Sequence, residues 1–202
     1  MITIVDYGMG NLGSILNMCK RIGAKAQITA DLETIRQADK ILLPGVGAFD
    51  AAISRIDQLG LRETLVSKAN TEKIPFLGIC LGMQLLTNSS EEGKLSGLGL
   101  IDAETIKLKF EILNMKVPHM GWNFVHPVNA SVLITGFTDE FRFYFVHSYY
   151  VKCNHQINVV MQTEYGHRFD SIIQRDNIFG AQFHPEKSHK YGMKLLENFS
   201  KI

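Results

Sequence analysis

Short runs of consecutive apolar residues alternate with amphipathic segments through the first half of the chain. Uninterrupted apolar runs of this length are typical of strands buried on both faces of a parallel sheet. Such strands are expected at 2–5, 25–29, 41–43 and 74–79. Helices are expected at 12–22, after a cap at Asp31, and at 49–70 with a break near Gly60. The alternation of strands and helices favours βαβ units and a parallel sheet.

The second half of the chain changes to strands that are joined by short polar turns. The expected strands are 101–107, 117–125, 142–151, 159–163, 169–174 and 178–183. Short turns favour antiparallel neighbours, and a helical pattern at 191–199 closes the chain. We therefore predict an α/β fold in one domain, residues 1–202, with a mostly parallel central sheet flanked by helices and additional antiparallel strands in the C-terminal half.

Composition and charge narrow the class of protein. The chain has 202 residues, 46% of them hydrophobic and 20% charged, with a formal net charge of +1. It can bury a substantial core, and it offers no reason to expect nucleic acid or a membrane as partner. Its three cysteines, Cys19, Cys80 and Cys153, form neither a disulfide framework nor a metal-ligand spacing. We expect a soluble domain of the cytoplasm that needs no metal or cofactor.

The stretch 75–86 passes from an apolar strand through Cys80 into an apolar helix. Gly78 and Gly82 flank the cysteine two positions away on each side, as in a tight strand–turn–helix corner where a β-carbon would clash. At the N-terminus of the helix, unpaired N–H groups and the helix dipole favour a thiolate. Packing as a small apolar side chain is the commoner fate of a free cysteine, but the paired glycines favour a nucleophile.

Two further segments can supply partners for such a nucleophile. His184 follows the expected strand 178–183, and Glu186 comes two residues later, so the imidazole can act as base and the carboxylate can orient it. Alone, this segment is better explained as a surface turn; together with a cysteine corner the balance reverses. The glycine-rich loop 45–47 ends another buried strand, and its N–H groups, with that of Leu81, can approach an oxyanion.

These segments together resemble the class I, triad-type, glutamine amidotransferases. The shared motifs are Gly-Ile-Cys-Leu-Gly-Met-Gln at 78–84, Pro-Gly-Val-Gly at 44–47 and His-Pro-Glu-Lys-Ser at 184–188. Within that family the chain is similar to the glutaminase subunits of imidazole glycerol phosphate synthases. This narrower resemblance is carried by 5–12, 43–49, 118–123 and 144–150, so it covers essentially the whole chain.

The resemblance implies a glutaminase of the amidotransferase fold, with a Cys80–His184–Glu186 triad. Cys80 would attack the side-chain amide of L-glutamine to form a γ-glutamyl thioester, His184 would transfer protons, and Glu186 would orient His184. The implied substrate-binding residues are Gly45, Val46, Gly47, Leu81, Gln84, His147, Ser148 and Tyr149.

The resemblance also implies a partner and a switch. The family passes ammonia through a tunnel to a (β/α)₈ synthase subunit in histidine biosynthesis, and Asn11 and Trp122 match positions at that interface. The unbound glutaminase is expected to be nearly idle, with the loop 45–47 misplaced until partner and acceptor bind. Two glycines in this loop make such a backbone flip inexpensive.

Other interpretations stay open. The segment 88–113 matches the histidine-pathway subunits less closely, and 11–15 and 187–193 look more like paralogues that supply ammonia for amidination of an acetamido sugar in surface polysaccharides. A non-catalytic scaffold and a cysteine peptidase are disfavoured by the intact triad and the glutamine-pocket motifs. His147 is expected to be a core histidine unless the glutamine pocket uses it. For Trp122, Gly-Trp-Asn in a turn context fits an exposed docking residue better than a core residue. Cys19 and Cys153 are expected to be structural thiols. The remaining histidines show no ligand spacing and receive no role: His119, His126, His155, His167 and His189.

Overall fold

The computed structural model describes residues 1–110, 115–137 and 140–202 and is built around one large mixed sheet. The strand order is β2-β1-β3-β4-β13-β12-β10-β6-β5, with β11 paired to β12 and β8. The parallel block comprises β1 (Ile2–Val5), β2 (Ala26–Thr29), β3 (Ile41–Gly45), β4 (Phe76–Cys80) and β13 (Ile178–Ala181). The other strands of this sheet are β5 (Ser89–Ser90), β6 (Ala103–Lys107), β8 (His126–Pro127), β10 (Tyr149–Cys153), β11 (Val159–Tyr165) and β12 (His167–Arg175).

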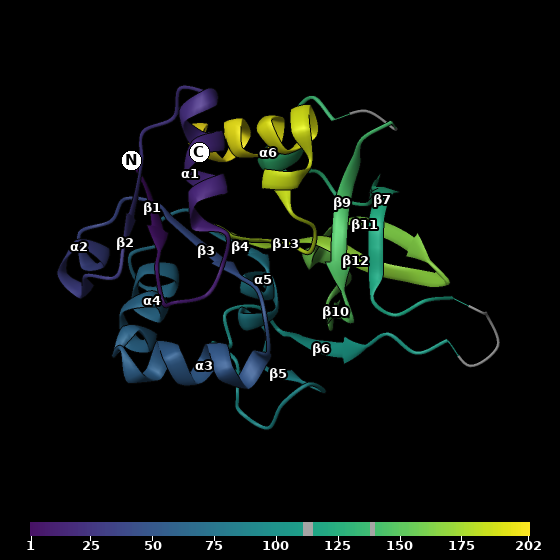
Figure 1. Cartoon of the computed structure of the whole chain (residues 1–202), viewed down its shortest axis with the longest axis horizontal. Coiled ribbons are helices and arrows are strands. Elements are labelled where there is room, and N and C mark those ends of the chain that lie inside the picture. Colours follow the sequence, from purple (N-terminus) through teal and green to yellow (C-terminus); the bar gives the residue numbers. More distant parts are fainter. Residues whose placement is uncertain (111–114, 138–139) are drawn as a thin grey trace.

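Helices cover both faces of the parallel block (Figure 1). One face is covered by α1 (Leu12–Arg21) and α6 (His189–Lys201). The other face is covered by α2 (Leu32–Arg36), α3 (Phe49–Gln58) and α4 (Leu61–Asn70). Successive strand residues point to opposite faces, so Val5 joins the core under α3 and Ile4 the core under α1. This two-sided burial explains the continuous apolar runs of the first half.

The predicted fold class is confirmed: the sheet is mostly parallel in the N-terminal half, and β12 pairs antiparallel with β10, β11 and β13. The predicted break in the helix 49–70 is confirmed at Gly60, which has φ +66° between α3 and α4. Asp31 caps α2 by accepting a hydrogen bond from the Thr34 N–H. The short strand β5 lies between the predicted elbow helix and the strand expected at 101–107, in a polar stretch for which the sequence predicts no strand.

One predicted strand is wrong. Residues 142–151 form two strands, β9 (Arg142–His147) and β10 (Tyr149–Cys153), which bend apart at Ser148 and enter different sheets. β9 pairs with β7 (His119–Phe124) in a separate two-stranded sheet, whereas β10 pairs with β6 and β12. The aromatic run contains no glycine or proline that would mark this break in the sequence. The break arises because the residues before and after Ser148 pair with different strands.

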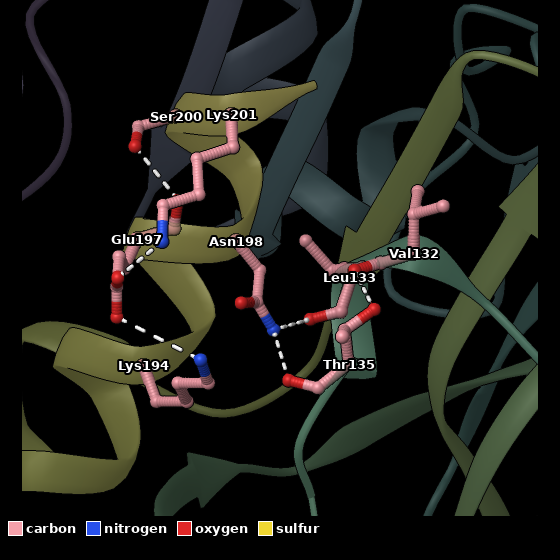
Figure 2. A network of polar contacts seen from close by, with 8 residues as sticks. All are labelled: Val132, Leu133, Thr135, Lys194, Glu197, Asn198, Ser200 and Lys201. Atoms are coloured by element: carbon pink, nitrogen blue, oxygen red, sulfur yellow. Dashed lines mark hydrogen bonds and ion pairs between the residues drawn. The ribbon is translucent and has the colours of Figure 1, made fainter.

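The C-terminal helix is hydrogen-bonded to two distant segments, of which Figure 2 shows the one around Leu133 and Thr135. The buried Asn198 amide donates hydrogen bonds to the carbonyls of Leu133 and Thr135, at 2.9 and 2.8 Å, and so holds the short 3-10 helix η1 (Val132–Ile134). At the end of α6, Lys40 of the segment before β3 donates to the carbonyls of Phe199 and Ser200. Its ammonium satisfies carbonyls that a helix end leaves unpaired. Within the described residues, no helix is long and apolar enough to cross a membrane.

Candidate active site

Cys80 stands at the corner between β4 and α5 (Leu81–Leu85) with φ +53° and ψ −112°. A non-glycine residue rarely adopts such a backbone conformation, which is characteristic of functional sites. The corner is so tight that a β-carbon on Gly78 would lie 2.5 Å from the Gly82 carbonyl oxygen, and one on Gly82 would overlap the Leu43 carbonyl. The two glycines that flank Cys80 are therefore required by the close approach of β3, β4 and α5.

His184 and Glu186 form an ion pair beside this corner. The distance between His184 Nδ1 and Glu186 Oε1 is 2.9 Å, and the two side chains are 5% and 2% exposed. The backbone N–H of His184 donates to the Tyr144 carbonyl at 2.9 Å, and its carbonyl accepts a hydrogen bond from the Ser188 hydroxyl. Because Glu186 engages Nδ1, the Nε2 atom of the ring is left to face a reacting group.

The electrostatic surroundings favour a charged imidazole. Burial lowers the pKa of His184, but the neighbouring Cys80 and Glu186 together raise it to about 10. His184 is therefore an imidazolium at neutral pH in this arrangement. A positive charge at that position stabilises a thiolate and can donate a proton to a leaving group.

Cys80 and His184 open onto a shared cavity of about 310 Å³. The size suits a small-molecule substrate. The sequence-predicted residues that line it are Val46, Gly47, Cys80, Leu81, Gln84, His147, Ser148, Tyr149 and His184. Gly45 and Glu186 lie directly behind this lining, as the residue before Val46 and the partner of His184. The fold thus brings together predicted site residues from four separate parts of the chain.

The end of β3 packs against Tyr7, and the loop that follows faces the cavity. Tyr7 is fully buried and donates its hydroxyl to the Pro44 carbonyl at 2.7 Å, and a β-carbon on Gly45 would lie 2.5 Å from that hydroxyl. Gly47 has φ +103°. Among the described residues, the backbone N–H groups of Val46 and Gly47 donate to no protein acceptor. They remain available to an oxygen atom of a ligand.

A buried pair of amides connects the wall of the cavity to Cys80. Gln84 Nε2 donates to the Tyr149 carbonyl at 3.1 Å and to Gln182 Oε1 at 3.2 Å, and Gln182 Nε2 lies 3.9 Å from Cys80 Sγ as donor. Gln182 is fully buried. Sequence reasoning missed it, although it is a lone polar residue in the apolar run 178–183 that leads to His184.

Four more residues without a sequence-based role in the site line the cavity: Glu92, Pro118, Val146 and Lys187. The Glu92 carboxylate accepts a hydrogen bond from the Phe49 N–H at 2.9 Å, which holds it at the N-terminus of α3. Glu92 lies in a polar loop with no recognisable motif, so no pattern in the sequence indicated that it belongs to the site. Together, Glu92 and Lys187 supply one negative and one positive side chain to the cavity wall.

Asn11 and Trp122 do not line the cavity. Asn11 is exposed at the start of α1, after β1, and Trp122 lies on β7 with 42% of its surface exposed. Met120, Trp122 and Phe124 alternate along the outer side of β7 and are all exposed; we call these three residues the docking face. Trp122 stacks on His189, with ring planes 4° apart. An exposed apolar face of this kind marks an interaction surface.

The other cysteines do not take part in the site. Cys19 is fully buried on the inner face of α1, and burial raises its pKa to about 11. Cys153 is half-buried, and burial also raises its pKa. Neither environment favours a thiolate. No cluster of metal-ligating side chains exists among the residues that the structure describes.

Known proteins resemble the chain over its full length. The family profile described as glutamine amidotransferase class-I matches residues 3–202. The Imidazole glycerol phosphate synthase subunit HisH 2 of Methanococcus maripaludis is 56% identical over 100% of this chain and 99% of that protein. The protein of the same description from Pseudomonas aeruginosa is 46% identical over 100% of both chains.

Solved structures support the same fold at low sequence identity. A crystal structure described as a glutamine amidotransferase superposes with a TM-score of 0.76 at 14% identity and covers 100% of both chains. A chain in the structure of PurLQS from Thermotoga maritima gives a TM-score of 0.72 at 17% identity, covering 98% of this chain and 96% of that one.

Proposed function

This chain belongs to the glutamine amidotransferase class-I family, and from that premise we propose that it is the glutaminase subunit of an imidazole glycerol phosphate synthase. The cavity that joins Cys80 and His184 is the observation that carries the glutaminase activity. The full-length likeness to two HisH subunits supports the pathway, histidine biosynthesis. A reduced catalytic thiol suits the cytoplasm.

The first half of the reaction is amide cleavage. The thiolate of Cys80 attacks the side-chain carbonyl carbon of L-glutamine, and the oxygen takes up negative charge. The N–H groups of Leu81, Val46 and Gly47 are the donors for this oxyanion. His184, protonated and paired with Glu186, gives a proton to the nitrogen, the C–N bond breaks, and ammonia leaves a γ-glutamyl thioester on Cys80.

The second half is hydrolysis of the thioester. His184, now neutral, accepts a proton from water, and the hydroxide attacks the thioester carbonyl. The C–S bond breaks, glutamate departs, and Cys80 returns to the thiolate with His184 protonated. Glu186 stays ionised through both halves and holds the Nδ1 side of the ring, so that Nε2 serves both transfers.

The wall of the cavity fits the ends of a free amino acid. Glu92 is the carboxylate among the lining residues, and its position suits the α-ammonium group of L-glutamine. Gln84 and His147–Tyr149 also line the cavity, and the Gln84 amide donates to the Tyr149 carbonyl. Glu92 therefore selects a free amino acid, and the triad cleaves its side chain.

The docking face receives the synthase partner, a (β/α)₈ subunit. Met120, Trp122 and Phe124 lie on the outer side of the β7–β9 sheet, while the Val146 carbonyl of the same sheet lies 3.9 Å from Cys80 Sγ. The partner would thus cover the sheet that walls the nucleophile, and Asn11 would contact it from α1. Ammonia would pass to the partner within the complex.

A second candidate function is supply of ammonia for amidination of an acetamido sugar. The segments 11–15 and 187–193, which resemble the paralogues that serve sugar amidination, favour this candidate. The glutaminase chemistry is the same in both candidates, and only the partner differs.

The experiment that separates the candidates measures glutamate release by the chain mixed with each type of synthase, with and without its acceptor. We expect the histidine-pathway synthase and its phosphoribosyl-carboxamide acceptor to raise glutamine hydrolysis well above that of the isolated chain. Stimulation only by the sugar-amidinating synthase would instead establish the second candidate. No stimulation and no hydrolysis with either would contradict the glutaminase itself.

A further inference from the structure

Two histidines meet on the inner side of the β7–β9 sheet, the side opposite the docking face. His119 of β7 and His147 of β9 are directly opposite in register, and the distance from His119 Nδ1 to His147 Nε2 is 2.9 Å. They are 2% and 5% exposed. The catalytic steps above use neither ring, and His119 does not line the cavity.

The hydrogen-bond partners define where the protons lie. His147 Nδ1 is 2.8 Å from the Tyr149 carbonyl, which can only accept, so Nδ1 carries the proton. In a neutral ring His147 Nε2 is then an acceptor, and His119 Nδ1 must donate to it. His119 Nε2 in turn accepts from the Asn123 amide at 3.3 Å. Burial lowers the pKa of His119 to about 4 and that of His147 to about 3, so both rings are neutral near pH 7.

The chain of donors ends on the wall of the substrate cavity. The Tyr149 carbonyl accepts from His147 and also from Gln84 Nε2, at 3.1 Å. Gln84 in turn contacts Gln182, whose amide faces Cys80 Sγ. The Tyr149 carbonyl is therefore held by two hydrogen bonds. One comes from the histidine pair, and the other comes from Gln84, which leads through Gln182 to Cys80.

The same chain begins beside the docking face. Asn123 lies between Trp122 and Phe124 on β7, with its side chain turned inward, and its amide also donates to the Glu164 carbonyl at 2.9 Å. A displacement of β7 would move the side chains of Asn123 and His119 directly, because both residues belong to this strand. The histidine pair is thus the polar connection, through the inner face of the sheet, between β7 and the cavity.

We propose that His119 is a positioning residue for glutamine hydrolysis, acting through His147 to hold the Tyr149 carbonyl and the Gln84 amide in place. This inference rests on the proposed function. A purely structural role is the competing explanation, because the His119 ring also stacks on Tyr165 and Phe145, with centroids 4.0 and 4.8 Å away. The experiment must therefore separate hydrogen bonding from packing.

The test compares variants within the complex with the synthase subunit. His119→Phe keeps an aromatic ring between Tyr165 and Phe145 but removes the donor to His147; His119→Asn retains an N–H near the Nδ1 position. His119→Phe loses both the donor to His147 and the acceptor for Asn123, and this should raise KM for glutamine about tenfold and change kcat less. His119→Asn should restore KM to within about threefold of the wild type, since its donor replaces Nδ1. Phe145→Leu keeps the His119 donor but removes the ring contacts that Phe145 makes with His119, His147, Phe169 and Phe183, and it should leave KM unchanged.

A nitrogen NMR measurement of tautomers gives a readout independent of turnover. Both His119 and His147 should carry the proton on Nδ1, and His119→Phe should leave His147 on the same tautomer with an altered Nε2 shift. The proposal is overturned by an Nε2–H tautomer at His147, by an unchanged KM in His119→Phe, or by an equal rise of KM in Phe145→Leu. A wild-type complex that releases no glutamate would overturn the proposed function, whereas an active wild type with an unaltered His119→Phe variant overturns this inference alone.

Discussion

Gln182 points its side-chain N–H at Cys80 Sγ over 3.9 Å while its carbonyl oxygen accepts a hydrogen bond from Gln84. A donor to sulfur favours the thiolate and fixes its direction. Gln182→Glu keeps the shape and the acceptor for Gln84 but places a carboxylate oxygen against the sulfur. We expect kcat/KM for glutamine to fall about 10–100-fold, the range for a hydrogen bond to a charged group.

The matched control for this change is Gln174→Glu on β12, whose amide donates to the Asp176 carbonyl and lies outside the cavity lining. Steady-state glutamate release should be unaffected there. Wild-type kcat/KM in Gln182→Glu would show that the amide contributes nothing to the reactivity of the sulfur.

Cys80 and Glu186 together should set the protonation of His184. With the pKa of His184 raised to about 10 from the ordinary 6.5 by these two neighbours, their interactions with the ring stabilise the folded chain fully below pH 6.5, and the contribution is lost as pH rises from 6.5 to 10. Glu186→Gln removes the charge, so the pKa should drop and kcat/KM should fall about 100-fold. NMR titration of the His184 ring measures the shift. Identical titration of His184 in both proteins would contradict this assignment of the pair.

The tight corner predicts opposite effects for two glycine-to-alanine changes. A β-carbon on Gly82 would overlap the Leu43 carbonyl, whereas one on Gly13 of α1 meets no atom within 4 Å. Gly82→Ala should lower the free energy of unfolding by about 3 kcal/mol or more, as overpacking does. Gly13→Ala should raise it by up to about 1 kcal/mol through helix propensity. Urea denaturation measures both, and a neutral Gly82→Ala would show that β3 and α5 can move apart.

The docking face should govern partner affinity. Trp122 is a half-exposed aromatic residue that packs on His189, and such residues dominate interface energetics. Trp122→Ala should raise the dissociation constant of the complex with the synthase partner about 30-fold, or about 2 kcal/mol. Ile157→Ala, a change at an even more exposed apolar residue outside this face, should leave the dissociation constant unchanged. Titration calorimetry measures both variants, and equal losses would place the interface elsewhere.

The sequence predicted those parts of the site whose residues lie close together along the chain. The glycines on either side of Cys80 are required by backbone crowding within a single corner. His184 and Glu186 are only two residues apart, so a short sequence motif contains each of these two arrangements. The continuous apolar runs also predicted the parallel block, because burial on both faces is a property of each strand by itself.

What the sequence did not reveal depends on contacts between distant strands. The bend at Ser148 is decided by which strands pair on each side of it. His119 received no role because its partner His147 is 28 residues away. Gln182 and Glu92 acquire their importance only where the strand β13 and the loop 88–94 approach the cavity.

Cys80 is the nucleophile of the proposed reaction, and trapping of its intermediate tests this most directly. The complex with the synthase partner is mixed with glutamine, quenched in acid, digested and analysed by mass spectrometry. We predict a γ-glutamyl thioester on the peptide that carries Cys80, and neither adduct nor glutamate release in Cys80→Ala that still binds the partner. Undiminished glutamine hydrolysis by Cys80→Ala, or an adduct on another residue, would contradict the role of Cys80 as nucleophile.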